Sequence, residues 1–281
     1  LPASQRGRDF AIMLASLGSL GYQIEWQVVN AADYGMPQRR RRVFILAYEA
    51  RTRHAQLLQK TSPLDWLNEK GVLARAFPGE TDYSPSLLPL RLSDDLVELS
   101  NSFNANTNGS SQPTPFATSG MFVNGEVFSG KRYPSYDGPC TVLGDILEAE
   151  PVAPEFYIDG KDLEKWEYLK GAKNEERTNK AGYSYNYTEG AINFPEPLDQ
   201  PSRTIITSEG GAGPSRFKHV ILTESGKFRR LTPLELERLN MFPDNFTEHP
   251  KVSNTKRAFL MGNALVIGIV EKIGKSLINL P

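Results

Sequence analysis

Apolar side chains recur at regular intervals near the start of the chain, and the interval predicts the local structure. Between residues 9 and 20 they return every three or four positions and Gly21 follows, which is typical of a helix that ends at a glycine. Residues 23–29 alternate apolar and polar side chains, as a half-buried strand does, and residues 43–48 form a second apolar strand. We expect these two strands to pair as an antiparallel hairpin with a long connecting loop.

The middle of the chain, residues 54–200, has a different pattern. It is rich in Pro, Gly, Ser, Asn and Asp, with only short apolar pieces between them. Residues 101–115 are polar, and residues 167–189 are charged and then rich in tyrosine. This composition predicts a loop-rich domain of short elements rather than a helical bundle.

The pattern becomes regular again after Pro201. Strands are expected over residues 202–207 and 217–223, separated by a glycine-rich turn. Thr232, Pro233 and Glu235 together predict a capped helix, because Thr can cap it, Pro suits its first turn and Glu falls at the capping-box position. This helix is expected to run to about residue 241, and a last helix from near residue 263 to about residue 277.

Composition limits the class of protein. With 281 residues, of which 39% are hydrophobic, the chain can form one large or two small domains. No apolar run approaches the ~20 residues that span a bilayer, and the first residues do not read as a signal peptide, so we expect no membrane association and cytoplasmic residence. The single cysteine, Cys140, allows no intrachain disulfide, and the three histidines are scattered, so no metal site is expected.

Charge is unevenly distributed along the chain. The formal net charge of −1 argues against a protein that coats nucleic acid non-specifically. Residues 1–53 nevertheless hold eight arginines against four acidic residues. A specific nucleic-acid enzyme with a local basic cleft remains compatible with this distribution.

Four consecutive arginines, residues 39–42, are the most informative segment. Such a run can be a solvated basic patch or a nucleic-acid tail. Here it lies between a Gly-Pro loop and an apolar strand. Since alternate side chains share one face of a strand, Arg40 and Arg42 are expected to point one way and Arg39 and Arg41 the other, so that one pair can enter a cleft.

The sequence Pro-Gln-Arg-Arg-Arg-Arg at residues 37–42 resembles the eighth conserved motif of DNA cytosine-5 methyltransferases. The resemblance implies that Arg42 reaches the flipped cytosine and polarises its O2, and that Arg40 holds the adjacent phosphate and helps to place the nucleophile. It also implies DNA contacts for Gln38 and Arg39. Arginine suits these roles because it stays charged and presents a fixed fork of donors to developing negative charge.

Two later segments resemble further motifs of the same family. Residues 229–244 are similar to the ninth motif, which implies that this helix supports the recognition domain and that Arg230 and Glu235 either contact the DNA backbone or fix the domain junction. Residues 261–274 are similar to the tenth motif, which implies that Gly262, Asn263 and Ala264 border the S-adenosyl-L-methionine site. Taken alone, each segment also reads as an ordinary amphipathic helix, with Asn263 as a cap and Gly262 permitting close approach.

Residues 201–213 are similar to the Thr-Leu/Ile dipeptide and glycine-rich loop of the family's target recognition domain. Without that resemblance the segment is a strand and a turn that bind nothing. Glycines allow a backbone to approach bases and phosphates closely. The DNA-binding residues that the resemblance implies here are Arg203, Thr204, Ile205, Ser208, Gly210 and Gly211.

Three other motifs of the family do not occur in residues 1–281: the Phe-x-Gly-x-Gly cofactor loop, the Pro-Cys-Gln segment that supplies the thiolate, and Glu-Asn-Val. In the family all three precede the arginine motif. Cys140 follows a proline, but Thr141 comes next and the pair lies after the arginine motif, so we expect a small, partly buried, non-catalytic residue. The chain is then part of a longer enzyme, one subunit of a split enzyme, or a degenerate DNA-binding remnant.

The resemblance implies an α/β fold: a partial Rossmann-like S-adenosylmethionine-dependent methyltransferase with a smaller, loop-rich target recognition domain inserted. Residues 1–53 would end the catalytic domain, residues 54–227 would form the recognition domain, and residues 228–281 would return to the catalytic domain. The implied reaction is methyl transfer from S-adenosyl-L-methionine to C5 of a flipped cytosine in double-stranded DNA, in a bacterial restriction-modification system. An N-terminal segment or subunit would carry the cysteine. The alternatives are a non-catalytic DNA-recognition subunit or remnant, and an RNA-directed relative.

Overall fold

The computed structural model describes residues 4–82, 89–104 and 114–279, and these form two compact units. Unit 1 contains residues 1–34, 41–138 and 270–281, as far as they are described. Unit 2 contains residues 35–40 and 139–269. The arginine run is therefore divided between the units after Arg40.

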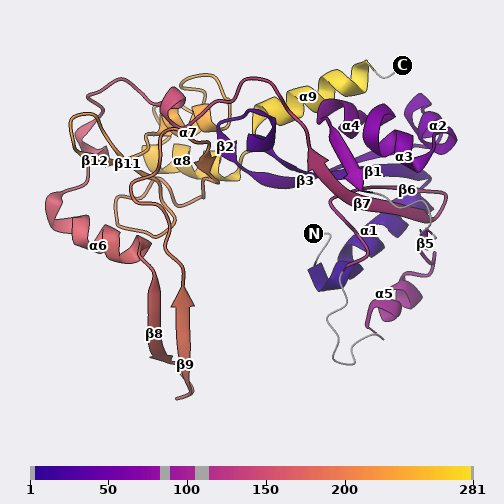
Figure 1. Ribbon diagram of the computed structural model, residues 1–281, viewed down its shortest axis with the longest axis horizontal. Coiled ribbons are helices and arrows are strands. Elements are labelled where there is room, and N and C mark those ends of the chain that lie inside the picture. Colours follow the sequence, from indigo (N-terminus) through magenta and orange to yellow (C-terminus); the bar gives the residue numbers. More distant parts are fainter. Residues whose placement is uncertain (1–3, 83–88, 105–113, 280–281) are drawn as a thin grey trace. The chain divides into compact units, whose positions relative to one another are not determined.

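A mixed set of helices and a sheet forms unit 1 (Figure 1). Its sheet has the order β3-β1-β6-β7-β4, with β5 also paired to β7. The strands are β1 (Tyr22–Asn30), β3 (Arg41–Glu49), β4 (Gly79–Asp82), β5 (Leu90–Arg91), β6 (Ser119–Val123) and β7 (Glu126–Pro134). The helical elements are η1 (Ser4–Gly7), α1 (Arg8–Ser19), η2 (Ala31–Tyr34), α2 (Arg53–Lys60), α3 (Pro63–Asp65), η3 (Trp66–Lys70), α4 (Val72–Ala76) and α5 (Leu96–Asn104).

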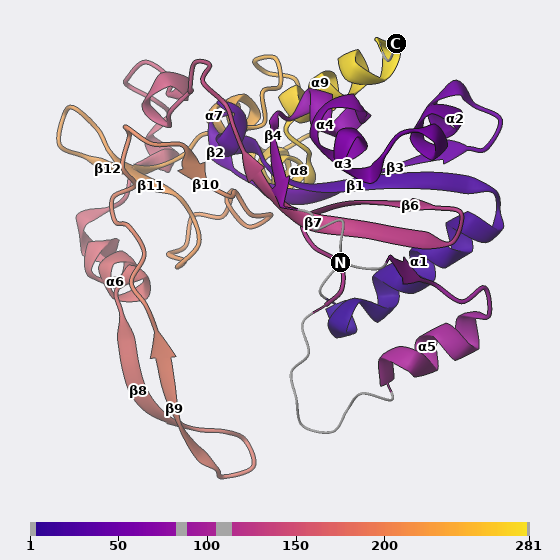
Figure 2. The same cartoon turned by 45° about the vertical axis from the view of Figure 1, so that its right-hand side comes forward.

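Two apolar cores hold these layers together. On one side of the sheet, α1 and α5 lie below the strands, and Phe10 packs edge-on against Trp26 and Phe116, with ring centroids 5.1 and 5.0 Å away (Figure 2). On the other side, α2, α3 and α4 cover the sheet. There the carboxylate of Glu25 accepts hydrogen bonds from Tyr48 Oη at 2.5 Å and Trp66 Nε1 at 3.0 Å.

The predicted hairpin is confirmed. Strands β1 and β3 pair antiparallel from Tyr22↔Glu49 to Asn30↔Arg41. The expected helix before them is α1, which lies within one residue of its predicted bounds. Both predictions rest on local periodicity, which depends little on the remainder of the chain.

The expected domain boundary after residue 53 does not coincide with a boundary between the compact units. Strand β6 pairs with β1 through Ile24↔Phe122, and β7 extends the same sheet, so unit 1 continues to residue 138. Of the polar stretch at residues 101–115, residues 105–113 lie outside the described part of the chain. The α/β class is confirmed, although every strand pair described in unit 1 is antiparallel.

Unit 2 consists of short strands and helices around a smaller core. Its strands are β2 (Gln38–Arg39), β8 (Lys173–Thr178), β9 (Ser184–Glu189), β10 (Ser202–Arg203), β11 (Val220–Leu222) and β12 (Phe228–Arg230). Its helical elements are η4 (Gly144–Ile146), η5 (Pro154–Phe156), α6 (Gly160–Lys170), α7 (Pro233–Leu239) and α8 (Asn254–Asn263), while α9 (Ile267–Ile278) begins in unit 2 and ends in unit 1. The core joins Leu143, Ile205, Ile221, Leu236, Leu239 and Met261.

The predicted helix at Pro233 is confirmed, with both halves of the capping box in place between Thr232 and Glu235. Three other expectations are corrected. The strands expected over residues 202–207 and 217–223 shorten to β10 and β11. Asn263 is the last residue of α8 and does not begin the last helix. Helix α8 begins after Ser253, whose side chain caps it by accepting from Lys256 N, and the last helix, α9, begins at Ile267. Among the described helices, none has the length and apolarity that crossing a bilayer requires.

Candidate functional site

Arg40 occupies the centre of a polar network in unit 2. Its side chain is only 4% exposed. Its Nη1 donates to the carbonyl of Ile205 at 3.1 Å, and its Nη2 donates to the carbonyl of Gly262 at 2.8 Å. One guanidinium therefore joins the arginine motif to two segments that follow it by more than 160 residues.

Gln38 completes this junction. Its Nε2 donates to the Leu239 carbonyl at 2.9 Å and to Asn240 Oδ1 at 2.6 Å, and its Oε1 accepts from Ile205 N at 3.4 Å. Asn240 Nδ2 in turn donates to the Met261 carbonyl at 2.8 Å. All four segments that the sequence distinguishes, at residues 37–42, 201–213, 229–244 and 261–274, thus meet in one hydrogen-bonded junction. A buried network of this kind favours one arrangement of the four segments, because each buried polar group left without a hydrogen-bond partner would cost about 1–3 kcal/mol.

The arginine run does not form one continuous strand. Arg40 N donates to the Gln38 carbonyl at 2.9 Å, which ends β2, and β3 begins at the next residue. Arg40 is buried and Arg39 exposed, as alternation predicts, but Arg41 and Arg42 are both exposed. The expected shared face of Arg40 and Arg42 is corrected accordingly, because Arg40 lies between β2 and β3 and the two residues do not belong to one strand. Arg42 belongs to unit 1, where its Nη1 donates to the carbonyl of Arg41 at 2.8 Å.

The residues of the Thr-Ile segment lie beside β2. Strand β10 pairs with it in parallel, and Thr204 Oγ1 donates to the Arg39 carbonyl at 2.5 Å. The side chain of Ile205 is 1% exposed and packs in the core of unit 2, so only its main chain faces the polar junction. The guanidinium of Arg203 forms a bidentate pair with the buried carboxylate of Glu196, with Nε 2.9 Å from Oε1.

The glycine-rich loop is fixed by packing and by a buried lysine. A Cβ at Gly210 would lie 2.7 Å from Thr255 Cα, so only glycine allows this approach to α8. Lys218 Nζ donates to the carbonyls of Gly211 and Gly213, both at 2.6 Å. Ser208 is exposed at the start of the loop. Gly210 therefore has a structural reason in this loop, independent of any ligand.

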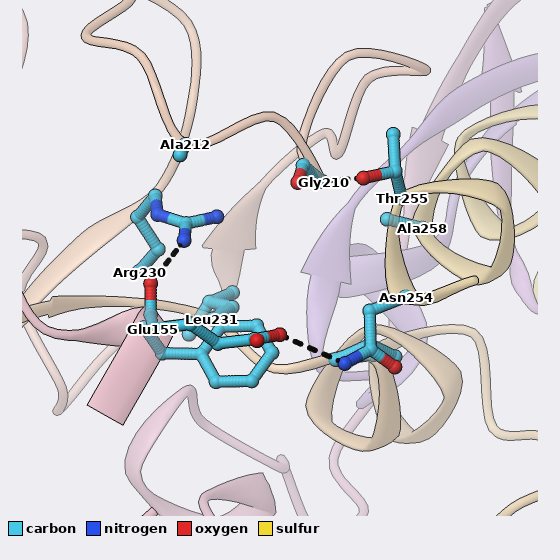
Figure 3. Close-up of a pocket in the computed structure, with 10 residues that line it drawn as sticks. Glu155, Gly210, Ala212, Arg230, Leu231, Asn254, Thr255 and Ala258 are labelled. Carbon is cyan, nitrogen blue, oxygen red and sulfur yellow. Dashed lines mark hydrogen bonds between the residues drawn. The ribbon is translucent and has the colours of Figure 1, made fainter. Parts of the chain in front are cut away.

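A cavity of about 230 Å³ lies between this loop, β12 and α8 (Figure 3). Arg230 crosses it and donates through Nη2 to the Glu155 carbonyl at 2.5 Å, while Asn254 Nδ2 donates to Glu155 Oε1 at 2.9 Å. Burial lowers the pKa of Arg230, with the charge of Glu155 opposing. The cavity is smaller than the ~300 Å³ at which small-molecule sites usually begin. It fits a structural role at the junction of the loop and the helix.

Sequence reasoning missed two buried charged pairs in unit 2. The first is Glu209 with His219: His219 Nδ1 lies 2.9 Å from Glu209 Oε1, and His219 N donates to Oε2 at 3.0 Å. Burial opposes ionisation of Glu209, but the charge and hydrogen bonds of His219 outweigh it and lower the pKa of the carboxyl. This pair anchors the glycine-rich loop to the chain before β11. Nothing in the sequence around His219 indicates that Glu209 is its partner.

The second pair joins Arg229 to Glu235, both at most 1% exposed. Arg229 Nη2 lies 2.7 Å from Oε1 and Nη1 lies 2.9 Å from Oε2, while Oε2 also accepts from Thr232 N at 2.8 Å. Glu235 therefore caps α7 and, at the same time, compensates the buried charge of Arg229 on β12. The sequence indicated the cap but not the arginine.

The three residues expected at a cofactor site lie at the end of α8. A Cβ at Gly262 would lie 2.5 Å from Thr207 N, so the close approach that this glycine permits is to the Thr-Ile segment. Asn263 is exposed, and its Nδ2 donates to the Phe259 carbonyl at 3.1 Å. Ala264 is half-buried against the core of unit 2. These residues offer an exposed polar edge rather than an enclosed cavity.

Cys140 and the histidines do not form a reactive cluster. Cys140 is exposed, not partly buried as expected, because it lies in the irregular segment that follows β7. Within the described ranges, no group of three or more His, Cys, Asp and Glu side chains could hold a metal ion.

Comparison with known proteins identifies the family. The model of the C-5 cytosine-specific DNA methylase family matches residues 1–279, and the chain belongs to this family. It is 40% identical over 279 residues to the type II methyltransferase M.Sau3AI of Staphylococcus aureus, covering 98% of this chain and 63% of that protein. It is 21% identical over 278 residues to the type II methyltransferase M.NlaX of Neisseria lactamica, covering 99% of this chain and 59% of that protein.

Among solved structures, the Dnmt2 methyltransferase of S. pombe aligns with 93% of this chain and 58% of its own, at 13% identity and a TM-score of 0.47. The chain thus spans about three fifths of the length of the curated relatives that it matches over nearly all its residues. The family membership confirms the resemblance drawn from the arginine motif and the two later motifs.

Proposed function

We propose that this chain is the part of a DNA cytosine-5 methyltransferase that positions a target cytosine in double-stranded DNA for methylation at C5. The observation that carries the proposal is the junction around Arg40 and Gln38. Four segments distant in sequence supply its members, and each of them is similar to a motif of the family. Family membership supports the same reading.

Arg42 is the residue we propose to contact the substrate base. Its side chain is exposed at the second residue of β3, and an arginine side chain stays charged. Attack on C6 of cytosine builds negative charge on O2 and N3, and a cation held near O2 lowers that barrier. The base must leave the DNA stack for this contact, because a stacked ring is inaccessible from above and below.

For Arg40 we propose positioning instead of direct chemistry. Both terminal nitrogens donate to main-chain carbonyls, so the guanidinium holds Ile205 and Gly262 in place. Gln38 acts in the same way. DNA contacts are proposed for the exposed Arg39, for Thr204, and for the exposed Ser208 with the backbone at Gly210 and Gly211. Arg203 and Ile205 contribute mainly through the position of their backbone, since their side chains are already engaged within unit 2.

S-adenosyl-L-methionine is the methyl donor that the family implies, and it supplies an electrophilic methyl group when bound. Asn263 fits one edge of such a site, because its exposed amide can hydrogen-bond a polar ligand. Gly262 and Ala264 fit as flanking backbone. An exposed edge does not enclose a cofactor, so we propose that an additional segment or subunit supplies the remaining surface and the nucleophilic cysteine.

The names of the two relatives place them among type II methyltransferases. We propose the same setting here: a bacterial restriction-modification system in the cytoplasm, with residues 139–227 of unit 2 contributing to target recognition. The proposed recognition region is narrower than the range 54–227 that the resemblance implies, because residues 54–138 complete the sheet of unit 1.

The test compares Arg42→Ala with Arg41→Ala in protein that contains both this chain and the cysteine-bearing segment. Tritiated methyl transfer to DNA and DNA affinity are measured in parallel. Arg42→Ala should lower transfer about 100-fold or more, as loss of one charge-stabilising donor does, and leave most of the affinity. Arg41→Ala removes a neighbouring exposed charge and should leave transfer nearly intact.

Two results would contradict the proposal. If the complete protein binds DNA but transfers no methyl group, the chain is a recognition module without catalysis. If Arg42→Ala abolishes binding as well as transfer, Arg42 holds the DNA backbone and its assignment to the base is wrong.

A further inference from the structure

A two-stranded ribbon extends from unit 2, and at its base Glu189 Oε1 lies 2.8 Å from Arg216 Nε. Strands β8 and β9 pair antiparallel from Lys173↔Glu189 to Thr178↔Ser184. Figures 1 and 2 both show the ribbon running from the end of α6 away from the other elements of unit 2. In the part of the chain that the structure describes, neither strand pairs with any third strand. A ribbon of this kind buries little core, so its length calls for a reason other than stability.

The two faces of the ribbon differ in chemistry. One face is internally paired: the Arg177 guanidinium stacks 3.6 Å from the ring centroid of Tyr187, and Lys173 Nζ lies 3.2 Å from Glu189 Oε2. The other face carries the exposed amide and hydroxyl side chains of Asn174, Thr178, Ser184, Asn186 and Thr188, together with the carboxylate of Glu176 opposite Asn186. Amide and hydroxyl groups of this kind lose little entropy on binding and can both donate and accept hydrogen bonds.

The turn at the tip of the ribbon is closed by hydrogen bonds. Asn179 Oδ1 accepts from Ala181 N at 2.9 Å and from Tyr183 N at 3.0 Å, and Asn179 N donates to the Tyr183 carbonyl at 3.0 Å. Gly182 adopts a φ of 85°, which closes the turn. A fixed turn presents the polar face in one geometry, which lowers the entropic cost of binding a partner.

Charge at the tip matches a polyanion. We define the hairpin tip as residues 177–187. It holds no Asp or Glu, and Lys180 is its cation at the turn. Arg177 already donates to Glu175 Oε2 at 3.1 Å, and the three acidic residues of the ribbon, Glu175, Glu176 and Glu189, lie nearer α6. Lys180 is exposed at the turn. The distal half of the ribbon is therefore the half that can approach phosphates.

Resting on the proposed function, we propose that the hairpin tip lies in the major groove of the DNA substrate and reads base edges through Thr178, Ser184 and Asn186. The major groove, about 12 Å wide, admits a two-stranded β-ribbon. Asn pairs in a bidentate manner with adenine, and hydroxyls accept or donate to several bases. Thr178 Oγ1 and Ser184 Oγ lie 3.3 Å apart, so both hydroxyls can turn toward one base pair. Lys180 then contacts the flanking phosphate backbone.

The test selects preferred sites from a library of duplexes with a randomised central segment, using protein that contains both this chain and the cysteine-bearing segment. Asn186→Ala and the double variant Thr178→Val/Ser184→Ala are compared with wild type. Each should lose about 10-fold discrimination at one or two base positions while affinity for unselected duplex is unchanged. Lys180→Ala should instead weaken binding to all duplexes and reduce the dependence of log affinity on log salt by about one.

Tyr185→Phe is the matched control, because it removes one hydroxyl from the opposite face of the same segment. Replacing the recognised adenine by 7-deazaadenine, which removes the N7 acceptor from the major groove, should weaken binding by wild type and leave binding by Asn186→Ala unchanged. Unchanged selection by both polar-face variants overturns the hairpin proposal. A loss with Tyr185→Phe as large as with Asn186→Ala overturns the choice of face. Failure of wild type to select any sequence counts against the proposed function itself.

Discussion

Replacing Glu235 by Gln tests whether the junction of β12 and α7 depends on a buried charge. Both carboxylate oxygens are fully used: Oε1 accepts from Arg229 Nη2 and Glu148 N, and Oε2 accepts from Arg229 Nη1 and Thr232 N. An amide of the same shape turns one oxygen into a donor. Whichever oxygen is replaced, an NH2 group then faces one guanidinium donor and one backbone donor.

The expected loss is large because two hydrogen bonds disappear and Arg229 keeps a buried charge. Breaking a buried ion pair from one side costs about 3–5 kcal/mol. Arg229 Nε retains a contact of 3.3 Å with Glu150 Oε1, so we expect the lower part of this range. At about 1.4 kcal/mol per tenfold change, the open population of α7 should rise roughly 100-fold. Hydrogen–deuterium exchange of the α7 amides measures this population directly.

Asp244→Asn is the matched control in the same unit. Arg238 and Asp244 form a pair of similar bidentate geometry, with Nε 2.8 Å from Oδ1, but the Asp244 side chain is 50% exposed. An exposed pair contributes about 0–1 kcal/mol. If Glu235→Gln accelerates α7 exchange no more than Asp244→Asn does, burial is not what makes the Arg229 pair strong. The double variant Arg229→Met/Glu235→Gln should lose less than the two single losses added together.

Three further predictions follow from the geometry. Gly262→Ala should destabilise unit 2 by about 1–3 kcal/mol in urea unfolding, because the added Cβ would meet the Thr207 backbone. The control Gly274→Ala adds a Cβ in open space on α9 and should raise the free energy of unfolding by about 0.5–1 kcal/mol. Equal effects of the two variants would contradict the packing. Burial raises the pKa of Glu25 to about 7, above its unfolded value of 4.5, so the folded state favours the protonated carboxyl. The free energy of unfolding of unit 1 should therefore fall by about 3 kcal/mol as pH rises from 4.5 through 7. If this pH dependence persists in Glu25→Gln, Glu25 is not its origin. Cys140→Ser should leave methyl transfer by the complete enzyme unchanged, and loss of transfer would give Cys140 a role in the reaction.

Local signals predicted the local parts of this structure. The Thr232 capping box lies within four residues, and its two hydrogen bonds need no distant partner. The hairpin of β1 and β3 follows from alternation in two neighbouring segments. The misplaced start of the last helix has a local cause as well: Gly262 and Asn263 resemble a helix start, yet Ser253 had already capped α8.

Long-range partners were outside the reach of the sequence patterns. Nothing near Arg40 indicates that its guanidinium will bind the carbonyls of Ile205 and Gly262. Likewise, the composition after residue 53 suggested a new domain, while β6 in fact joins β1 through pairing across about a hundred residues. The family resemblance identified which segments matter, and the structure gives the contacts through which they meet.

The division of unit 2 along the chain has a consequence for biosynthesis. Residues 35–40 belong to this unit, but the partner of Arg40 at Gly262 is 222 residues further along. At translation rates of about 5–20 residues per second, this separation corresponds to roughly 10–45 s. During that time β1 and β3 can pair, while the side chains of Gln38 and Arg40 stay solvated until α7 and α8, which supply their partners, have been synthesised. The junction that we propose positions the DNA is therefore among the last parts of the chain to form, so an interrupted chain that ends before α8 lacks it.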